Sequence, residues 1–566
     1  MPLFKMIKLS NMTNKRYFSS LLAICLLIAA SACTKINDYL DKAESGGVTE
    51  EALFADYVQV EGYLANMYAT TIGAGDWMPQ TTFTYAAASD DAKCPYNFAY
   101  GTVNFNNGTV SPTNNPIDTW NGTYQNIRKA NTFLKYIDDV PAKTAIQIDG
   151  KPRMKGEGFF MRAWCYAELM KRYGGVPLID RVLTIDENLN IPRNTVKEVV
   201  DFIAKDIDSA MVYLPLSYPV VNAGRITKGA AMMLKARVYL YAASPLHNPA
   251  GNRDLWKRAA DAHKAVMDLK VYSLQPEYKT VLHVRNSPEI MMQSTINQVW
   301  QVVAQDWVRH TEPPSQGGGW GNLQPSQNLV DEFEMANGKM ITEAGSGYDP
   351  NNPYVGRDPR FDKSIIYNGR KWGLPTGAVI NTYMGAGIDA LGSTNTASTQ
   401  TGYYDGKLLD ENATLITSYR PGNHYWVFMR YAETLLNYAE ALNESSDAPP
   451  QEVYDVLNQV RSRDSVKMPP VPTGLGKDDM RLRIRHERRI ELCMEPHRFW
   501  DVRRWRIGTE VFKDIYGMRI TKPTSTTFKY EKFLVESRTY KPAFDLFPIP
   551  QSEMERNKAL IQNPGY

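Results

Sequence analysis

Apolar residues recur every three or four positions along most of this chain, which is the period of one face of an α-helix. The clearest stripe runs through Phe159, Ala163, Tyr166, Ala167, Met170 and Tyr173. Gly174, Gly175 and Pro177 follow it and predict the end of that helix. The same period predicts helices over residues 49–68, 120–140, 155–173, 195–214, 227–243, 254–269, 430–443, 450–463 and 478–494. We therefore expect a mostly α-helical fold.

Local signals support paired helices. Thr195 and Glu198 have the spacing of a capping box, in which each side chain satisfies a free backbone N–H at a helix start. Small residues in the segment 227–243 let helices approach closely, as in tetratricopeptide-type hairpins; they are Ala230, Ala231, Ala236, Ala242 and Ala243. The strict 34-residue consensus of that repeat is poorly matched, so we expect tetratricopeptide-like units rather than regular repeats.

Two loop-rich regions, residues 73–118 and 281–425, interrupt the helical pattern. The second contains the Pro- and Gly-rich tract 313–322 and the polar tract 392–402, with turn-forming residues every few positions. Long loops in compact domains usually carry function, so we interpret 281–425 as a variable insertion that faces the ligand. The remaining parts are then an N-terminal helical part, 33–280, and a C-terminal part, 426–566.

The N-terminal 32 residues have the order of a secretion signal. Lys15 and Arg16 precede an apolar run over residues 21–30, and the small residues Ser31 and Ala32 precede Cys33. The run is shorter than the ~20 residues that cross a bilayer, so a permanent membrane span is the weaker interpretation. We predict a lipoprotein signal with lipid attached at Cys33; the alternative is an ordinary secretory signal cleaved near Ala32.

Charge and cysteine content narrow the function. Removing the signal removes four basic residues and no acidic one, which takes the formal net charge from +3 to −1. A nearly neutral chain does not favour nucleic acid as a partner. The odd set Cys94, Cys165 and Cys493 implies no disulfide framework. Cys165 and Cys493 lie in helical patterns as expected core residues, whereas Cys94 lies in a loop-like stretch where a free thiol fits.

Aromatic residues indicate the chemistry of a ligand. They make up 11% of the chain, with 33 Tyr and 11 Trp, and many stand in Gly- and Asn-rich segments. Flat rings stack on the C–H faces of sugars, and Asn and Asp side chains bind hydroxyl groups. The candidate ligand-binding residues in the two loop regions are Asp76, Trp77, Tyr96, Tyr100, Trp307, Trp320, Asn322, Tyr403 and Tyr404. Trp320 is the best of them, because its flanking glycines cannot bury it by themselves.

The sequence contains no complete motif for catalysis or for metal binding. The segment 486–490 begins like a zinc-protease helix but lacks the second histidine, and no nucleophile elbow or phosphate loop is present. We predict no catalytic residues, no metal ligands and no cofactor, and the sequence does not decide a calcium requirement. The segment 481–506 holds nine arginines, but acidic residues interleave with them. We therefore expect internal ion pairs there.

Several ordered motifs resemble the SusD/RagB family of outer-membrane lipoproteins. They are residues 120–131, 156–163 continuing to 173–177, 358–361, 430–433 continuing to 439–441, 487–492, 498–505, 547–550 and 562–566. Pro496 departs from the glycine usual in the family, which affects a local turn only. The resemblance implies a SusD-like α-helical fold with four tetratricopeptide-like helix-turn-helix units and a variable ligand-binding region.

The resemblance also implies a function without supplying catalytic residues. Members of the family partner SusC-like TonB-dependent transporters and face the cell exterior from the outer membrane. We therefore expect non-catalytic binding of an oligosaccharide and its delivery to such a transporter, with the lipid at the N-terminus as the membrane contact. The alternatives are peptide capture by the same fold, as in RagB, a structural transporter subunit, and a surface glycosidase, whose paired carboxylates are spatial rather than sequential.

Overall fold

The computed structural model of the protein describes residues 49–72, 83–96, 100–184, 186–284, 287–293, 309–373, 377–411 and 426–566. Helices dominate, and their N-terminal set is α3 (Glu50–Phe54), α4 (Tyr57–Thr71), α5 (Tyr100–Asn106), α6 (Trp120–Tyr136), α7 (Ala145–Tyr173), α8 (Val196–Tyr213), α9 (Lys228–Ala243) and α10 (Arg253–Met267). The later helices are α12 (Gln327–Val330), α13 (Pro359–Ser364), α14 (Tyr431–Ser445), α15 (Gln451–Arg461), α16 (Lys477–Glu491), α17 (His497–Arg504), α18 (Gly508–Val511) and α19 (Gln551–Arg556).

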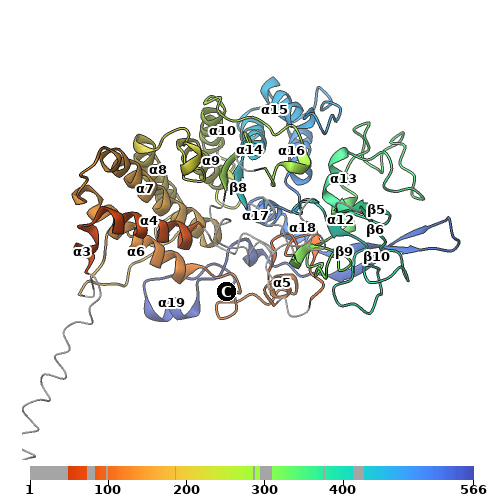
Figure 1. Cartoon of the computed structure of the whole chain (residues 1–566), viewed down its shortest axis with the longest axis horizontal. Coiled ribbons are helices and arrows are strands. Elements are labelled where there is room, and N and C mark those ends of the chain that lie inside the picture. The colour runs from red at the N-terminus through yellow and green to blue at the C-terminus, as the bar shows by residue number, and fades with distance from the viewer. Residues whose placement is uncertain are drawn as a thin grey trace, which may run out of the picture.

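The long helices form one continuous packed series. Each helix from α6 to α10 packs on the next, and α10 packs on α14, which contacts α15 and α16. Figure 1 shows this series running from α3 and α4 at one end of the molecule to α16, with the loop-rich part and a long hairpin at the other end. The loop-rich region between α10 and α14 in the sequence therefore leaves the helical series and returns to it.

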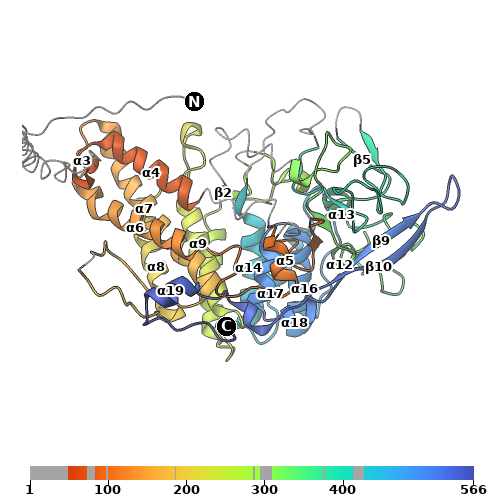
Figure 2. The ribbon, with the colours of Figure 1, turned by 90° about the horizontal axis from the view of Figure 1, so that it is seen from below.

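The strands of the described residues form five antiparallel pairs, four of them short. The pairs are β1 (Ala92–Lys93) with β3 (Gln324–Pro325), β2 (Ile290–Gln293) with β8 (Val427–Arg430), β4 (Ile365–Ile366) with β7 (Tyr404–Asp405), β5 (Arg370–Trp372) with β6 (Ala378–Ile380), and β9 (Asp514–Thr521) with β10 (Lys529–Ser537). Figure 2 shows β9 and β10 projecting from the end of the molecule opposite α3 and α4. The described 3₁₀ turns are Ile137–Asp139, Val220–Asn222, Tyr278–Thr280 and Pro542–Asp545.

The nine helical segments expected from periodicity are confirmed, with shifts at their ends. The segment 49–68 is two helices, because Asp56 interrupts it and caps α4 by accepting the Val58 N–H at 2.8 Å. Helix α16 ends at Glu491, before Met494, whose φ of +64° does not continue a right-handed helix. The Thr195 capping box is present at the start of α8.

Helix α7 extends ten residues further toward its N-terminus than the apolar stripe predicts. A second capping box, between Thr144 and Gln147, begins it, and Pro152 lies within it. At the other end α7 stops at Tyr173, where Gly174 adopts a φ of +77°. The expected stop at the two glycines is therefore confirmed, because this left-handed conformation suits a residue without a Cβ.

Candidate functional site

The best sequence candidate, Trp320, lies in a turn that folds back on its own loop. Its backbone N–H donates to the Arg309 carbonyl at 2.6 Å, and the Asn322 N–H donates to the His310 carbonyl at 2.6 Å. These bonds hold the tract 313–322 against residues 309–312 although no long strand or helix supports it. The Gly-rich composition therefore encodes an ordered turn.

The Trp320 side chain is half-buried and packs against the core from the loop. Its ring centroid lies 4.7 Å from that of His310, with the planes tilted by 37°. Tyr96 also supports the turn, because its hydroxyl donates to the Trp320 carbonyl at 2.5 Å. A Cβ on Gly319 would overlap the Glu312 backbone, so this neighbour must lack a side chain. The ring is thus held in place while part of it remains accessible.

Asn322 and Tyr96 brace the turn instead of facing solvent. Asn322 is 1% exposed, and its Oδ1 accepts a bond from the Cys94 thiol at 2.6 Å. Tyr96 is 9% exposed, and burial raises the pKa of its hydroxyl to about 12. Cys94 is unpaired but buried, and burial raises the pKa of its thiol to about 11. Asn322 and Tyr96 therefore position Trp320. The Cys94 thiol is not a reactive group at the surface.

Tyr403 and Tyr404 are packing residues in this structure. Both side chains are fully buried at 0% exposure. The Tyr403 hydroxyl donates to Gln327 Oε1 at 2.6 Å, and the Tyr404 hydroxyl donates to the Asp389 carbonyl at 3.1 Å. We expected them to present rings to a ligand, but strand β7 directs Tyr404 into the core and Tyr403 packs beside it, so we remove both from the candidate surface.

The other sequence candidates fall where the structure gives no side-chain description. Asp76, Trp77 and Trp307 lie outside the described residues, as does the expected lipid site at Cys33. Tyr100 begins helix α5, but its side chain is not described. Their roles stay predictions.

The loop that contains Met384 and Asp389 lies next to the Trp320 turn. Asp389 accepts the Ser315 N–H at 2.9 Å, which ties this loop to the Trp320 turn. Burial raises the pKa of the Asp389 carboxyl. The Met384 N–H donates to the Ile520 carbonyl at 2.9 Å, which ties the same loop to the hairpin β9–β10. The loop therefore bridges the turn and the hairpin.

Apolar and aromatic side chains along this bridge are accessible. The rings of Tyr383 and Phe528 lie 5.5 Å apart, and the Lys522 ammonium lies 5.2 Å from the Tyr383 ring. Met384 and Ile388 are 45% and 48% exposed. We call the set the loop surface; it comprises Trp320, Tyr383, Met384, Ile388 and Phe528. Sequence analysis missed all but Trp320, although the glycines Gly385 and Gly387 directly after Met384 were a comparable signal.

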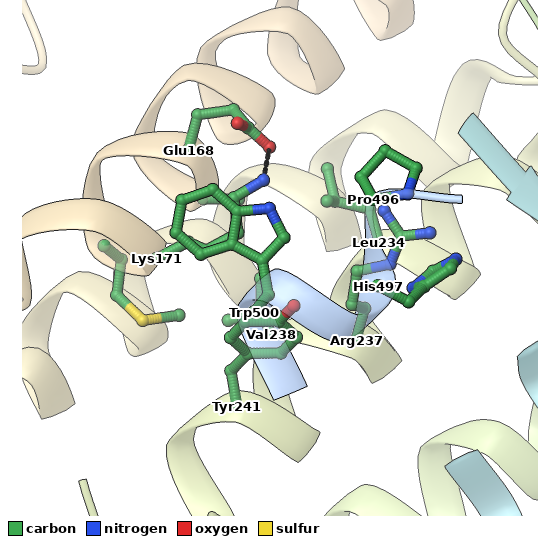
Figure 3. A pocket seen from close by; sticks show the side chains of 11 residues that line it. Glu168, Lys171, Leu234, Arg237, Val238, Tyr241, Pro496, His497 and Trp500 are labelled. Carbon is green, nitrogen blue, oxygen red and sulfur yellow. Dashed lines mark hydrogen bonds and ion pairs between the residues drawn. The ribbon is translucent and has the colours of Figure 1, made fainter. Parts of the chain in front are cut away.

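A separate cavity lies where α7, α9 and α17 meet. Figure 3 shows Lys171 bonded to Glu168 beside the Trp500 ring. The Lys171 ammonium is 2.7 Å from Glu168 Oε1 and 4.6 Å from the ring centroid, and burial lowers its pKa to about 7. The cavity volume is about 30 Å³, which leaves room for only a few water molecules. It is a small gap in the packing of three helices and is too small for a sugar.

Most arginines of the segment 481–506 form ion pairs with acidic side chains, including the half-exposed Arg506. Arg488 pairs with Asp501 at 2.6 Å, and Arg504 pairs with Glu440 at 2.6 Å. The interleaved carboxylates at 487, 491 and 495 pair with arginines from other parts of the chain, namely Arg360, Arg430, Arg461 and Arg463. Ion pairing inside the protein is therefore confirmed, but these three carboxylates find their partners outside the segment and not at the helical steps that we expected. The pairs hold the C-terminal helices to the rest of the protein.

The described part of the chain contains neither a metal site nor a membrane-spanning helix. No group of three or more His, Cys, Asp or Glu side chains there has the arrangement of a metal site. No helix among the described residues is long and apolar enough to cross a membrane.

Comparisons with known proteins agree with this architecture. The sequence model of the SusD family matches residues 284–566, and a second model, described as "Starch-binding associating with outer membrane", matches residues 38–240. SusD-like protein P2 of Formosa agariphila is 25% identical over 96% of this chain and 98% of its own length.

Solved structures from Bacteroides fragilis are also similar. One SusD-like protein is 31% identical, with a TM-score of 0.77 over 92% of this chain and 99% of its own. Another, described as a SusD-like carbohydrate binding protein, is 26% identical, with a TM-score of 0.73 over 90% of this chain and 100% of its own. The fold is therefore the SusD-like α-helical fold that the motifs implied. With matched segments at both ends and structural similarity across nine-tenths of its length, the chain belongs to the SusD family.

Proposed function

We propose that the protein is a non-catalytic glycan-binding lipoprotein of the outer membrane that captures an oligosaccharide and passes it to a SusC-like TonB-dependent transporter. The observation that carries the proposal is the loop surface, where backbone bonds hold the half-buried ring of Trp320 and the bridging loop adds the half-buried rings of Tyr383 and Phe528. Such a surface stacks sugar rings. The carbohydrate-binding and starch-binding descriptions of similar proteins support the same ligand class.

The chemistry of the loop surface favours reversible binding. Each ring contact contributes about 1 kcal/mol, so a few contacts by themselves correspond to dissociation constants in the millimolar range. A protein that hands its ligand to a transporter needs such release. We also propose that lipid at Cys33 holds the protein on the outer face of the outer membrane.

The test is isothermal titration of the protein, starting after Cys33, with a panel of oligosaccharides and peptides. Trp320→Ala is expected to weaken oligosaccharide binding about tenfold, which corresponds to a loss of about 1.4 kcal/mol. Trp320→Phe keeps a ring and is expected to retain most of the affinity. Tyr213→Ala, a partly buried ring on α8, is the matched control and is expected to leave binding unchanged.

Other outcomes select the alternatives. Saturable peptide binding without sugar binding would contradict the glycan proposal and favour peptide capture. Binding of nothing in the panel would favour a structural subunit. New reducing ends that a single Asp or Glu substitution abolishes would show a glycosidase.

A further inference from the structure

A second cavity, separate from the loop surface, opens beside strand β2. Its volume is about 340 Å³, which is within the range of small-ligand sites. Its walls come from the α8–α9 connection, the residues after α10, and β2; they include Tyr218, Arg225, Tyr272, Met292 and Gln293. No residue of the loop surface lines it.

Two tyrosine rings form part of the wall. The Tyr218 hydroxyl donates to the Ile226 carbonyl at 3.0 Å, and the Tyr272 hydroxyl lies 3.2 Å from Thr227 Oγ1. Because these hydroxyls already bind protein atoms, Tyr218 and Tyr272 would contact a ligand mainly through their rings. Leu216 and Val271 at the cavity are 44% and 45% exposed, which adds apolar contact area at the rim.

A buried glutamine in the wall has an amide oxygen without a hydrogen-bond partner in the described part of the chain. Gln293 is 7% exposed, and its Oε1 has no hydrogen-bond partner among the described residues. A hydrogen-bond donor of a bound ligand would satisfy this oxygen. A sugar hydroxyl is such a donor.

The cavity also carries excess positive charge. Glu157, fully buried, pairs with Arg153 at 2.7 Å and with Arg225 at only 3.3 Å, and it accepts a bond from the Tyr68 hydroxyl at 3.0 Å. Two arginines therefore share one carboxylate, and Arg225, with 30% of its side chain exposed, lines the cavity. No Asp or Glu appears among the described residues of the lining.

We propose that this cavity binds a carboxylated sugar unit, such as a uronic acid, whose carboxylate pairs with Arg225 while its ring packs against Tyr218 and Tyr272 and a hydroxyl donates to Gln293. Rings, an acceptor amide and an unbalanced guanidinium match the three parts of such a sugar. The inference rests on the proposed function in one respect, that the ligand is a glycan. It adds a second binding site and an acidic substrate class.

The probes are trimers of galacturonic acid, the same trimers as methyl esters, and neutral galactose trimers, titrated into the protein starting after Cys33. The acid trimer is expected to bind at least tenfold more tightly than its methyl ester, because the ester removes the negative charge that pairs with Arg225 and adds only a methyl group. Arg225→Met is expected to abolish that preference, and Arg225→Lys to keep part of it. Gln293→Met is expected to weaken the acid and the ester equally.

Arg258→Met is the matched control, because Arg258 is a partly exposed arginine in a different groove, over Tyr239. It is expected to leave the preference unchanged. Equal binding of acid and ester, or an unchanged preference in Arg225→Met, overturns the cavity proposal. Acid binding that Trp320→Ala abolishes and Arg225→Met spares also overturns it and leaves the proposed function standing. Binding of no glycan at all, neutral or acidic, overturns both.

Discussion

His263 on α10 is a histidine that the fold keeps neutral. Its side chain is 0% exposed, and neither ring nitrogen has a hydrogen-bond partner within the described ranges. Burial lowers its pKa to about 3, with Glu433 opposing this shift and Arg237 adding to it. The unfolded chain binds a proton on this residue below pH ~6.5, whereas the folded chain does not.

His263→Leu is therefore expected to change how stability depends on pH. Because the unfolded state binds more protons below pH ~6.5, the native protein loses stability there, by about 2 kcal/mol at pH 5 from this residue. The leucine variant lacks this loss, so its stability relative to the native protein should rise by about that amount between pH 8 and pH 5. Urea unfolding at the two pH values measures it. An equal difference at both pH values would show that His263 titrates normally.

At the scale of single elements, α8 depends on its capping box. The Thr195 hydroxyl accepts the Glu198 N–H at 3.2 Å, and Glu198 Oε2 accepts the Thr195 N–H at 2.7 Å. Thr195→Ala is expected to lower the free energy of unfolding by about 1 kcal/mol. Thr195→Ser keeps the hydroxyl and should recover most of it in the same urea unfolding measurement. Equal losses in both variants would assign the effect to the lost methyl group.

Long helices were the predictable elements of this fold. Residues 120–136, 196–213 and 228–243 combine a sustained apolar period with clear starts and stops, so local sequence and final structure agree. The hairpin β9–β10 was missed because Phe533 and Leu534 of β10 are consecutive apolar residues among charged neighbours, so the alternation typical of a strand is weak. The first turns of α7 were missed because Ile146 and Ile148 are exposed and do not continue the apolar stripe, and because Pro152 is an unfavourable residue inside a helix; the Thr144 capping box begins the helix there.

The candidate site was less predictable than the helices. Composition identified the region and Trp320, but it treated Tyr403 and Tyr404 alike, and only the pairing of β7 with β4 shows that Tyr404 points inward. The Gln293 and Arg225 cavity was not predicted, because its chemistry depends on Glu157, 68 residues away from Arg225, sharing its charge between two arginines. A carboxylate shared by two arginines depends on how the folded chain brings them together, and it leaves no pattern in the local sequence.

At the scale of the molecule, buried ion pairs join distant parts of the chain. Asp90, which lies in the first loop region, pairs with Arg498 of α17 at 2.7 Å and with Arg489 of α16 at 2.9 Å. Burial raises the pKa of Asp90, but Arg489 and Arg498 outweigh it and hold that pKa below its usual range. The pair therefore stabilises the fold above pH ~4, and this contribution is lost as the pH falls and the carboxylate binds a proton.

Removing one side of this contact tests whether it holds the whole molecule together. Arg498→Met is expected to lower the free energy of unfolding by about 3–5 kcal/mol, because it leaves the Asp90 charge buried with one partner fewer. Adding Asp90→Asn should recover part of the loss, since the unpaired charge disappears. The two substitutions would then be strongly non-additive in urea unfolding. Lys257→Met breaks the exposed pair with Asp261, whose side chains are 67% and 66% exposed, and should cost no more than about 0.5 kcal/mol. If Arg498→Met cost no more than this control, or if the double variant showed the sum of the single losses, the pair would not couple the first loop region to the C-terminal helices.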